Sequence, residues 1–361
     1  MTRLDKFFLE LSRTEYDAAL ISSGINQRYL SGFKYTSGYI LITREKAFLL
    51  ADFRYIEAAR MTLAGTKFEV IEPKLGMLTE LALLLKENKV KTLIVEDETV
   101  SFSECNRYKE KFGKDVQVLG GASAILSKMR EVKDEEELSL IKKAQSITDA
   151  AFEHILKVMT PNMTEVDVLL ELEFFMRRNG AEDVAFGTIA VSGSASSMPH
   201  GHARNVKLER GFLTMDFGAK YEGYCADMTR TVVLGGADAE MKKLYNTVLS
   251  AQRAALEMFG EGVSCYELDK CARNIIEGAG YRGCFGHSLG HGIGMVVHEG
   301  PRVAPSTDPK ALLVRGNITS CEPGIYLAGK YGCRIEDLVA IELDGRANDI
   351  TKSPKELIEL F

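Results

Sequence analysis

The chain has 361 residues, of which 45% are hydrophobic and 27% charged, and its formal net charge at pH 7 is −6. This length predicts two domains, and the composition is typical of a soluble globular protein. The acidic balance and the lack of a Lys/Arg run argue against a nucleic-acid partner, and no apolar stretch reaches the roughly 18 residues that a membrane span needs.

Strand-like and helix-like segments alternate through the first part of the chain. The N-terminal twenty residues lack the apolar core of a signal peptide and are typical of an amphipathic helix. Strands are predicted at 17–23, 38–43, 46–52 and 90–97, and helices at 53–64 and 77–89. The pattern predicts an α/β domain over residues 1–127, with a largely buried sheet and no phosphate-binding loop.

A charged stretch then begins a long helix and a second domain, predicted over residues 128–361. Asp134 and Glu135–Glu137 place negative charge where a helix N-terminus favours it. Two similar helix pairs follow, at 148–159 and Thr164–Gly180, and at 239–259 and Ser264–Gly280. Thr164 and Ser264 each precede an acid by three residues, as in a capping box. Because glycine-rich, strand-like sequence follows each pair, we predict an internal repeat whose strand pairs form one curved sheet.

The strand-like ends of the two halves carry acids. In the first half, the segment DFGAKYEGYCAD (216–227) predicts a hairpin with its turn at Lys220 to Gly223. A turn centred between Tyr221 and Glu222 places Asp216 directly opposite Asp227, where like charges repel. The second half has two acids at corresponding places, Glu322 and Glu336. Pairing the halves therefore brings four carboxylates together.

Four neighbouring carboxylates require either protonation or bound cations, because like charges raise one another's pKa. His291, in the glycine-rich segment GHSLGHGIGMVVHEGP (286–301), adds a nitrogen ligand and favours cations. Such an oxygen-rich set suits Mn²⁺, Co²⁺ or Fe²⁺, with Zn²⁺ as an alternative. A centre of two such ions predicts amide hydrolysis. Glu322 could then also shuttle protons, and His298 and His200 are available as donors to the oxyanion and the substrate.

Simpler interpretations exist for single residues. A lone hairpin Asp is usually solvated, and Glu-Pro-Gly is usually a turn. His154 and His202 have no motif partner and are interpreted as bystanders. Arg334 is either a surface cation or a partner to a ligand carboxylate, since it lies two residues before Glu336 on the same strand face. The seven cysteines form no CxxC pair, which indicates reduced thiols in a cytoplasm.

Five segments in order resemble the pita-bread metallopeptidases, and among them the proline-specific branch of Xaa-Pro dipeptidase (prolidase) and aminopeptidase P. The segments are SGSASSMPHG (192–201), MDFGAKYEGYCADMTRT (215–231), GHSLGHGIGMVVHEGP (286–301), CEPGIY (321–326) and GCRIEDLVAI (332–341). The segments GINQRYLSGF (24–33) and LLADFRYIEAA (49–59) are less specifically similar to that branch's N-terminal domain. The resemblance implies a creatinase/prolidase-like α/β domain and an α+β pita-bread catalytic domain with a pseudo-twofold repeat.

The resemblance also implies roles for single residues. It implies five ligands of two Mn²⁺ or Co²⁺ ions: Asp216, Asp227, His291, Glu322 and Glu336. It makes Glu322 the general base and puts His200 and His298 at the substrate. It places His287 and Arg334 near the site. His202, in PHGHARN, departs from the family pattern.

The expected activity is hydrolysis of Xaa-Pro bonds in proline-containing di- or oligopeptides by a cytoplasmic homodimer. The short chain favours a dipeptidase, with aminopeptidase P as the alternative. Methionine aminopeptidase usually lacks so large an N-terminal domain. A non-catalytic pita-bread binding protein is the alternative of a different class, but such proteins typically lose ligands, as creatinase-like members do. The N-terminal domain, which has no catalytic motif, is expected to help build the dimer and wall the pocket.

Overall fold

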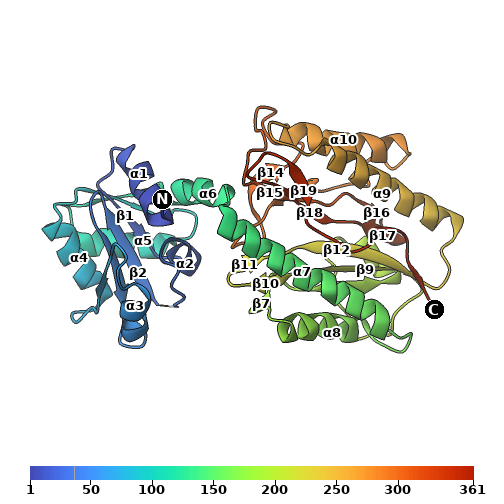
Figure 1. The fold of residues 1–361 in the computed structure, drawn as a ribbon, viewed down its shortest axis with the longest axis horizontal. Helices are drawn as coiled ribbons and strands as arrows, with labels where there is room; N and C mark the ends of the chain where they lie inside the picture. The colour runs from blue at the N-terminus through green and yellow to red at the C-terminus, as the bar shows by residue number, and fades with distance from the viewer. Residues whose placement is uncertain (36) are drawn as a thin grey trace. The chain divides into compact units, whose positions relative to one another are not determined.

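The computed structural model describes residues 1–35 and 37–361, and it divides into two compact units, Met1–Arg130 and Glu131–Phe361 (Figure 1). The predicted boundary between residues 127 and 128 falls inside helix α6 (Ala122–Glu131), at whose last residues the units divide. Within the described ranges, no helix has both the length and the apolar character of a membrane span.

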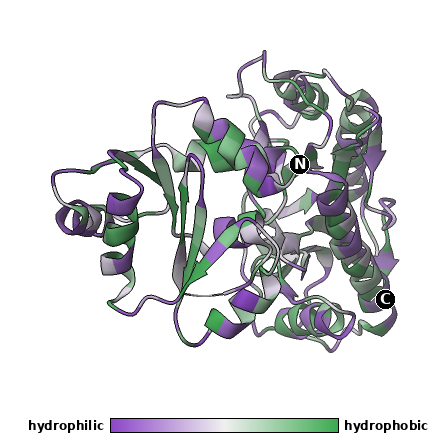
Figure 2. Cartoon of the chain, turned by 60° about the vertical axis from the view of Figure 1, so that its left-hand side comes forward, coloured by the Kyte–Doolittle hydropathy of each residue, from purple (hydrophilic) through white to green (hydrophobic). Residues whose placement is uncertain are grey.

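The first unit is a six-stranded sheet with helices. In spatial order its strands are β4 (Phe68–Ile71), β3 (Ala47–Ala51), β2 (Gly38–Thr43), β1 (Ala18–Ile21), β5 (Thr92–Val95) and β6 (Gln117–Gly120). The other helices are α1 (Arg3–Ser12), α2 (Gly24–Ser31), α3 (Ile56–Thr62), α4 (Met77–Glu87) and α5 (Phe102–Phe112). The sheet is coloured mostly as hydrophobic in Figure 2, while the helices carry both colours. Strands β1 and β3 are buried along their whole length, as expected for a sheet with both faces covered.

The predicted α/β character of this unit is confirmed. The four predicted strands correspond to β1, β2, β3 and β5, and the predicted helices to α1, α3 and α4. Strands β4 and β6 were not predicted because neither presents a run of buried apolar residues. Helices α2 and α5 were missed although Ser23 and Ser101 accept hydrogen bonds from the first helical turns, which is a signal that the sequence offers.

The second unit contains two helix pairs, α7 (Glu135–Val158) with α8 (Glu165–Arg178), and α9 (Ala239–Met258) with α10 (Cys265–Gly278) (Figure 1). Asp134 caps α7 and forms a capping box with Glu137, as its acidic start predicts. The predicted helix 148–159 is the second half of α7. Each pair belongs to a separate hydrophobic core, and the core of α9 and α10 also includes Phe212 and Val233 from the first half. The repeat is therefore visible in the order of elements.

The strands divide between two main sheets. The first is β20 (Glu359–Leu360), β12 (Met228–Leu234), β9 (Gly211–Phe217) and β8 (Ile189–Ser192). The second is β14 (Glu299–Val303), β13 (Gly290–Gly292), β15 (Ile318–Cys321), β18 (Asp337–Ile341) and β19 (Ala347–Asp349). Smaller ladders join β11 (Tyr224–Cys225), β10 (Ala219–Tyr221) and β7 (Asp183–Val184), and join β16 (Gly324–Leu327) to β17 (Tyr331–Arg334).

The prediction of one curved sheet is therefore wrong: Asp216 lies on β9 of the first sheet, and Glu322 directly follows β15 of the second. At the junction, the Glu336 N–H donates to the Thr229 carbonyl (3.1 Å). Side chains make other links there, with the Arg230 guanidinium donating to the Glu336 carbonyl (2.6 Å) and the Thr231 hydroxyl to the Arg334 carbonyl (2.9 Å). These side-chain bonds occupy backbone acceptors that a continuous ladder would use.

The register of the first hairpin also differs from the prediction. Its two turn residues are Glu222 and Gly223, with φ of 46° and 90°, and Tyr221 pairs with Tyr224. Positive φ at both central residues is the requirement of a type I′ turn. The turn centre lies one residue later than predicted, so Asp216 faces Thr229 and not Asp227. Because Asp227 is two residues from Thr229, it still shares the face of Asp216.

The two predicted capping boxes have different outcomes. Thr164 caps α8 and forms the box with Asp167. Ser264 lies at the N-cap of α10, but its side chain makes no capping hydrogen bond and donates instead to the Pro309 carbonyl (2.9 Å). The second box is therefore a wrong prediction, since a neighbouring carbonyl competes for the hydroxyl.

Candidate metal centre

Strand ends of both sheets bring three predicted ligands together. Asp227 directly precedes β12, His291 lies on β13, and Glu336 directly precedes β18. One potential ligand atom from each lies within 4.8 Å of the other two. Asp227 and Glu336 are buried, with 4% and 1% of their surfaces exposed. Asp227 and Glu336 are more than a hundred positions apart in the chain, so only the tertiary fold brings the three residues together.

Glu322 joins this group through His291. The distance from His291 Nε2 to Glu322 Oε1 is 3.2 Å, and that from His291 Nε2 to Asp227 Oδ2 is 3.8 Å. His291 Nδ1 lies 3.1 Å from the Gly292 carbonyl oxygen, to which it donates because that oxygen can only accept. Nε2 therefore faces the carboxylates, the orientation of a metal-ligating histidine whose other nitrogen is held by a backbone group.

The fifth predicted ligand, Asp216, is tied to Arg334. The buried Arg334 guanidinium donates to Asp216 Oδ2 at 2.5 Å and to the Thr229 hydroxyl at 2.9 Å. That hydroxyl in turn donates to Glu336 Oε2 (2.7 Å). Arg334 is thus a buried partner of a carboxylate in the other half, and the alternative of an ordinary surface cation does not apply.

The charges of the group are unbalanced. Burial and then the neighbouring Glu336 raise the pKa of Asp227 well above its usual value, and burial and then Glu322 raise the pKa of Glu336. Burial also opposes ionisation of Glu322, but its hydrogen bond and ion pair with His291 outweigh that effect and lower the pKa of Glu322 to about 2. The same pair raises the pKa of His291 although burial lowers it.

Unpartnered oxygens show what the group lacks. Asp216 Oδ1, Asp227 Oδ1 and Glu336 Oε1 are buried without a hydrogen-bond partner. Buried polar atoms are normally satisfied, so three such oxygens in one place need an explanation. Divalent cations would satisfy the oxygens and balance the negative charge together. The residues present therefore fit bound metal ions.

A polar network at the edge of the group includes a residue that sequence reasoning missed. The Tyr326 hydroxyl lies 2.9 Å from His287 Nε2 and accepts from Arg334 (2.7 Å). Burial raises the pKa of Tyr326 to about 12 and lowers that of His287. Tyr326 ends the segment CEPGIY, and its place four residues after Glu322 was the available signal. The network puts His287 and Arg334 beside the carboxylates.

The remaining histidines differ in their surroundings. His298 is exposed, and its ring lies edge-to-face with that of His291, with centroids 4.3 Å apart. Although the residue reaches the surface, partial burial of its ring and then the nearby His291 lower the pKa of His298. His200 is exposed in a turn after η1 (Gly193–Ser197), and the carbonyl of the preceding Pro199 accepts from Arg334 (3.4 Å). His202 is exposed two residues further along.

Comparison with known proteins places this geometry in a family. The pattern of metallopeptidase family M24 matches residues 139–342, and that of the creatinase/prolidase N-terminal domain matches residues 3–132. The chain is 36% identical to an Xaa-Pro dipeptidase of Pyrococcus horikoshii over 358 residues, which cover 99% of this chain and 98% of the relative.

Solved structures have the same architecture. An Xaa-Pro dipeptidase from Bacillus anthracis matches with a TM-score of 0.94 and 37% identity over 99% of each chain. An X-Pro aminopeptidase from Thermotoga maritima matches with a TM-score of 0.88 and 39% identity, over 98% of this chain and 100% of the other. The creatinase/prolidase-like N-terminal domain and pita-bread catalytic domain predicted from the sequence are confirmed. The chain belongs to metallopeptidase family M24 and is a metallopeptidase.

Proposed function

We propose that the protein hydrolyses Xaa-Pro peptide bonds at a centre of two divalent metal ions, acting as an Xaa-Pro dipeptidase. The observation that carries the proposal is the convergence of four carboxylates and one histidine with three buried oxygens lacking partners. The proposed ligands are Asp216, Asp227, His291, Glu322 and Glu336. Mn²⁺ or Co²⁺ suits this oxygen-rich set best, with Zn²⁺ and Fe²⁺ as alternatives.

Bound divalent cations supply the Lewis acidity that activates water and polarises a carbonyl group. The chain supplies the proton chemistry. Glu322, whose lowered pKa keeps it ionised at neutral pH, is the group to which we assign the transfer of a proton to the leaving nitrogen. His298 has a lowered pKa and is neutral at pH 7, so it donates a hydrogen bond without carrying charge. We assign it to the developing oxyanion, and we assign His200 to the substrate.

The nature of the scissile bond limits how the substrate is held. An Xaa-Pro amide nitrogen carries no hydrogen, so the enzyme must bind the carbonyl, the terminal groups and the apolar proline ring. Relatives named Xaa-Pro dipeptidase support the assignment. The X-Pro aminopeptidase of Thermotoga maritima, at 39% identity, supports the second candidate, an aminopeptidase acting on longer peptides. A non-catalytic binding protein is disfavoured because all five predicted ligand positions retain metal-ligating side chains.

Hydrolysis of Gly-Pro and Gly-Pro-Pro, each with added Mn²⁺, tests the proposal. We expect faster cleavage of Gly-Pro and loss of cleavage after a chelator, with recovery on adding Mn²⁺. Gly-Ala, whose amide carries a hydrogen, is the control for proline specificity. Preference for Gly-Pro-Pro would favour the aminopeptidase, and no cleavage of either proline peptide would contradict both candidates.

Assembly and location remain proposals. We propose a homodimer to which the N-terminal domain contributes, and sedimentation at micromolar concentration tests it, since a fully active monomer would contradict the assignment. A cytoplasmic location is supported by the seven cysteines, which are all free thiols.

A further inference from the structure

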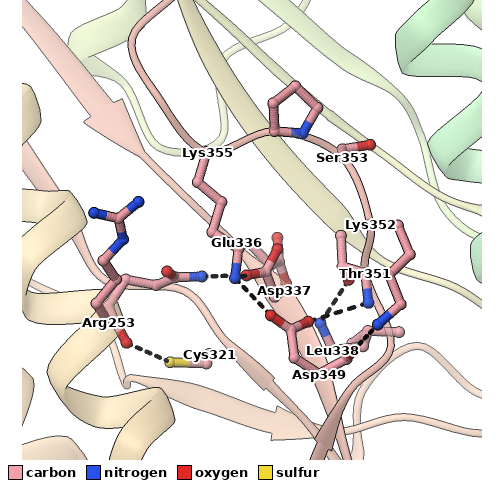
Figure 3. Close-up of polar contacts among 12 residues, drawn as sticks. Arg253, Cys321, Glu336, Asp337, Leu338, Asp349, Thr351, Lys352, Ser353 and Lys355 are labelled. Carbon is pink, nitrogen blue, oxygen red and sulfur yellow. Dashed lines mark hydrogen bonds and ion pairs between the residues drawn. The ribbon is translucent and has the colours of Figure 1, made fainter.

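A buried charge cluster lies behind the strand that follows Glu336. Asp337 is fully buried, and its carboxylate accepts hydrogen bonds from Arg230 (2.7 Å) and from Gln252 on α9 (2.6 Å). Lys355 Nζ lies 2.5 Å from Asp337 Oδ2 and 2.5 Å from Asp349 Oδ2. Figure 3 shows Lys355 reaching between the two aspartates. We call Arg230, Asp337, Asp349 and Lys355 the back cluster.

The back cluster is connected to the metal centre through adjacent residues. Successive side chains of an extended chain point to opposite sides, so Glu336 faces the other carboxylates while Asp337 faces α9. The same alternation holds on the neighbouring strand, where Thr229 donates to Glu336 and Arg230 donates to Asp337. The contact between Thr229 and Glu336 at the front of the junction thus has a counterpart in the contact between Arg230 and Asp337 at its back.

The C-terminal segment closes the back cluster. The Arg230 guanidinium, which is 1% exposed, donates to the carbonyls of Ser353 (2.8 Å) and Pro354 (2.9 Å). It also donates to the Glu336 carbonyl (2.6 Å). One side chain therefore joins the backbone of a proposed ligand to the segment that carries Lys355.

Charge explains why Lys355 is needed there. The back cluster holds two carboxylates, Asp337 and Asp349, and two cations, Arg230 and Lys355. Without Lys355, the fully buried Asp337 would lose one of its two cationic partners, and Asp349 would lose its ion pair. A buried carboxylate that loses its partner either becomes protonated or pulls the backbone toward solvent. Asp337 directly follows Glu336 in the chain. A movement of the backbone at Asp337 would therefore displace the Glu336 carboxylate.

We infer that Lys355 is a positioning residue, which fixes Glu336 for metal binding through its bridge to Asp337 and Asp349. Lys355 itself touches none of the proposed ligands. The inference rests on the proposed metal centre. It assigns the C-terminal segment a role in tuning that centre, in addition to its packing against β12.

Titration of the metal-depleted full-length protein with Co²⁺ alone tests the inference, followed by the visible absorption bands of the bound ion, which report its coordination. We expect Lys355→Met to raise the apparent dissociation constant severalfold and to alter the bands, a smaller effect than the roughly tenfold or more that follows loss of a direct partner of a ligand. Lys242→Met is the matched control. It removes another lysine contact to the C-terminal segment, an exposed pair with Glu359 (3.4 Å), and should leave the titration unchanged.

The double variant Asp349→Asn/Lys355→Met guards against simple unfolding, because it removes one cation and one anion and keeps the charge of the back cluster balanced. It still lacks the bridge, so we expect weakened Co²⁺ binding in it as well. Wild-type binding and bands in both Lys355 variants, with only a lower melting temperature, would show a merely structural role and overturn the inference. Failure of the wild-type protein to bind Co²⁺ would overturn the proposed metal centre and this inference together.

Discussion

The two acid-bearing hairpins of the second unit have different registers. In the first, Asp216 faces Thr229. In the second, Cys321 pairs with Asp337 and Gly324 with Arg334, and this common register places Glu322 opposite Glu336. In the first hairpin Thr229 stands where the second hairpin has an acid, and the Thr229 hydroxyl donates a hydrogen bond to Glu336 of the second hairpin. The hairpins are therefore complementary: one places two acids face to face, and the other supplies a neutral donor to one of them.

The difference limits what a sequence repeat implies. Repeated elements put acids on the inner face of both hairpins, because a shift of two residues keeps the face. The repeated elements do not fix the pairing register of the two strands, because the geometry of the turn sets that register. Arg334 then links the halves by donating to Asp216 and Thr229. Four predictions examine this complementarity, in order of decreasing effect.

The largest effect is expected at Asp227. Asp227→Ala should abolish activity and remove both metals, because Asp227 lies buried among the other proposed ligands and we propose that it would help to hold both ions. Elemental analysis and Gly-Pro hydrolysis measure the two effects. Asp183→Ala, at an exposed carboxylate on β7 of the small ladder with β10 and β11, is the control and should retain both metals. Full metal occupancy in Asp227→Ala would defeat the assignment.

The ion pair between Arg334 and Asp216, which links the two halves, should be nearly as sensitive to substitution. Arg334→Met removes the buried cation beside Asp216, whose side chain is 14% exposed, and losing one partner of a buried pair costs about 3–5 kcal/mol. We expect this loss in the free energy of unfolding of the metal-free protein, measured with urea. Arg282→Met removes an arginine whose side chain is 85% exposed and should change stability by less than about 0.5 kcal/mol. Equal stability of the two variants would mean that Arg334 does not hold the halves together.

A smaller effect separates the histidines. His298→Ala should lower kcat by about 10²-fold, the scale of losing one oxyanion donor, while both metals remain bound. His202→Ala should change little, because the proposed ligand set is complete without it. Steady-state kinetics and metal analysis of both variants check these roles. They would be wrong if His202→Ala lost its metals while His298→Ala kept full turnover.

The smallest effect compares the helix caps. Thr164→Ala removes a formed capping box and should destabilise the protein by about 1 kcal/mol. Ser264→Ala removes an exposed hydroxyl that does not cap α10, so we expect a loss of about 0.5 kcal/mol or less. Urea unfolding of the two variants measures the difference. A larger loss for Ser264→Ala would reverse the comparison between the halves.

Most of the local elements, the family and the proposed metal ligands could be predicted from the amino-acid sequence alone. Apolar periodicity and caps such as Asp134 are local properties, so they are readable without a structure. Motifs such as GHSLGHGIGMVVHEGP carry their histidines and glycines at fixed spacings, so the resemblance identified the fold that the comparisons confirm.

Tertiary structure decided what local patterns leave open. The Glu222–Gly223 turn set the first register, and the side chains of Arg230 and Thr231 bond across the junction of the two sheets. The sequence places Tyr326 close to Glu322, but no local feature marks the partners of Tyr326 or of Lys355. Their roles arise from burial, because a buried polar group must find a partner among whatever residues the fold brings near, however distant in sequence.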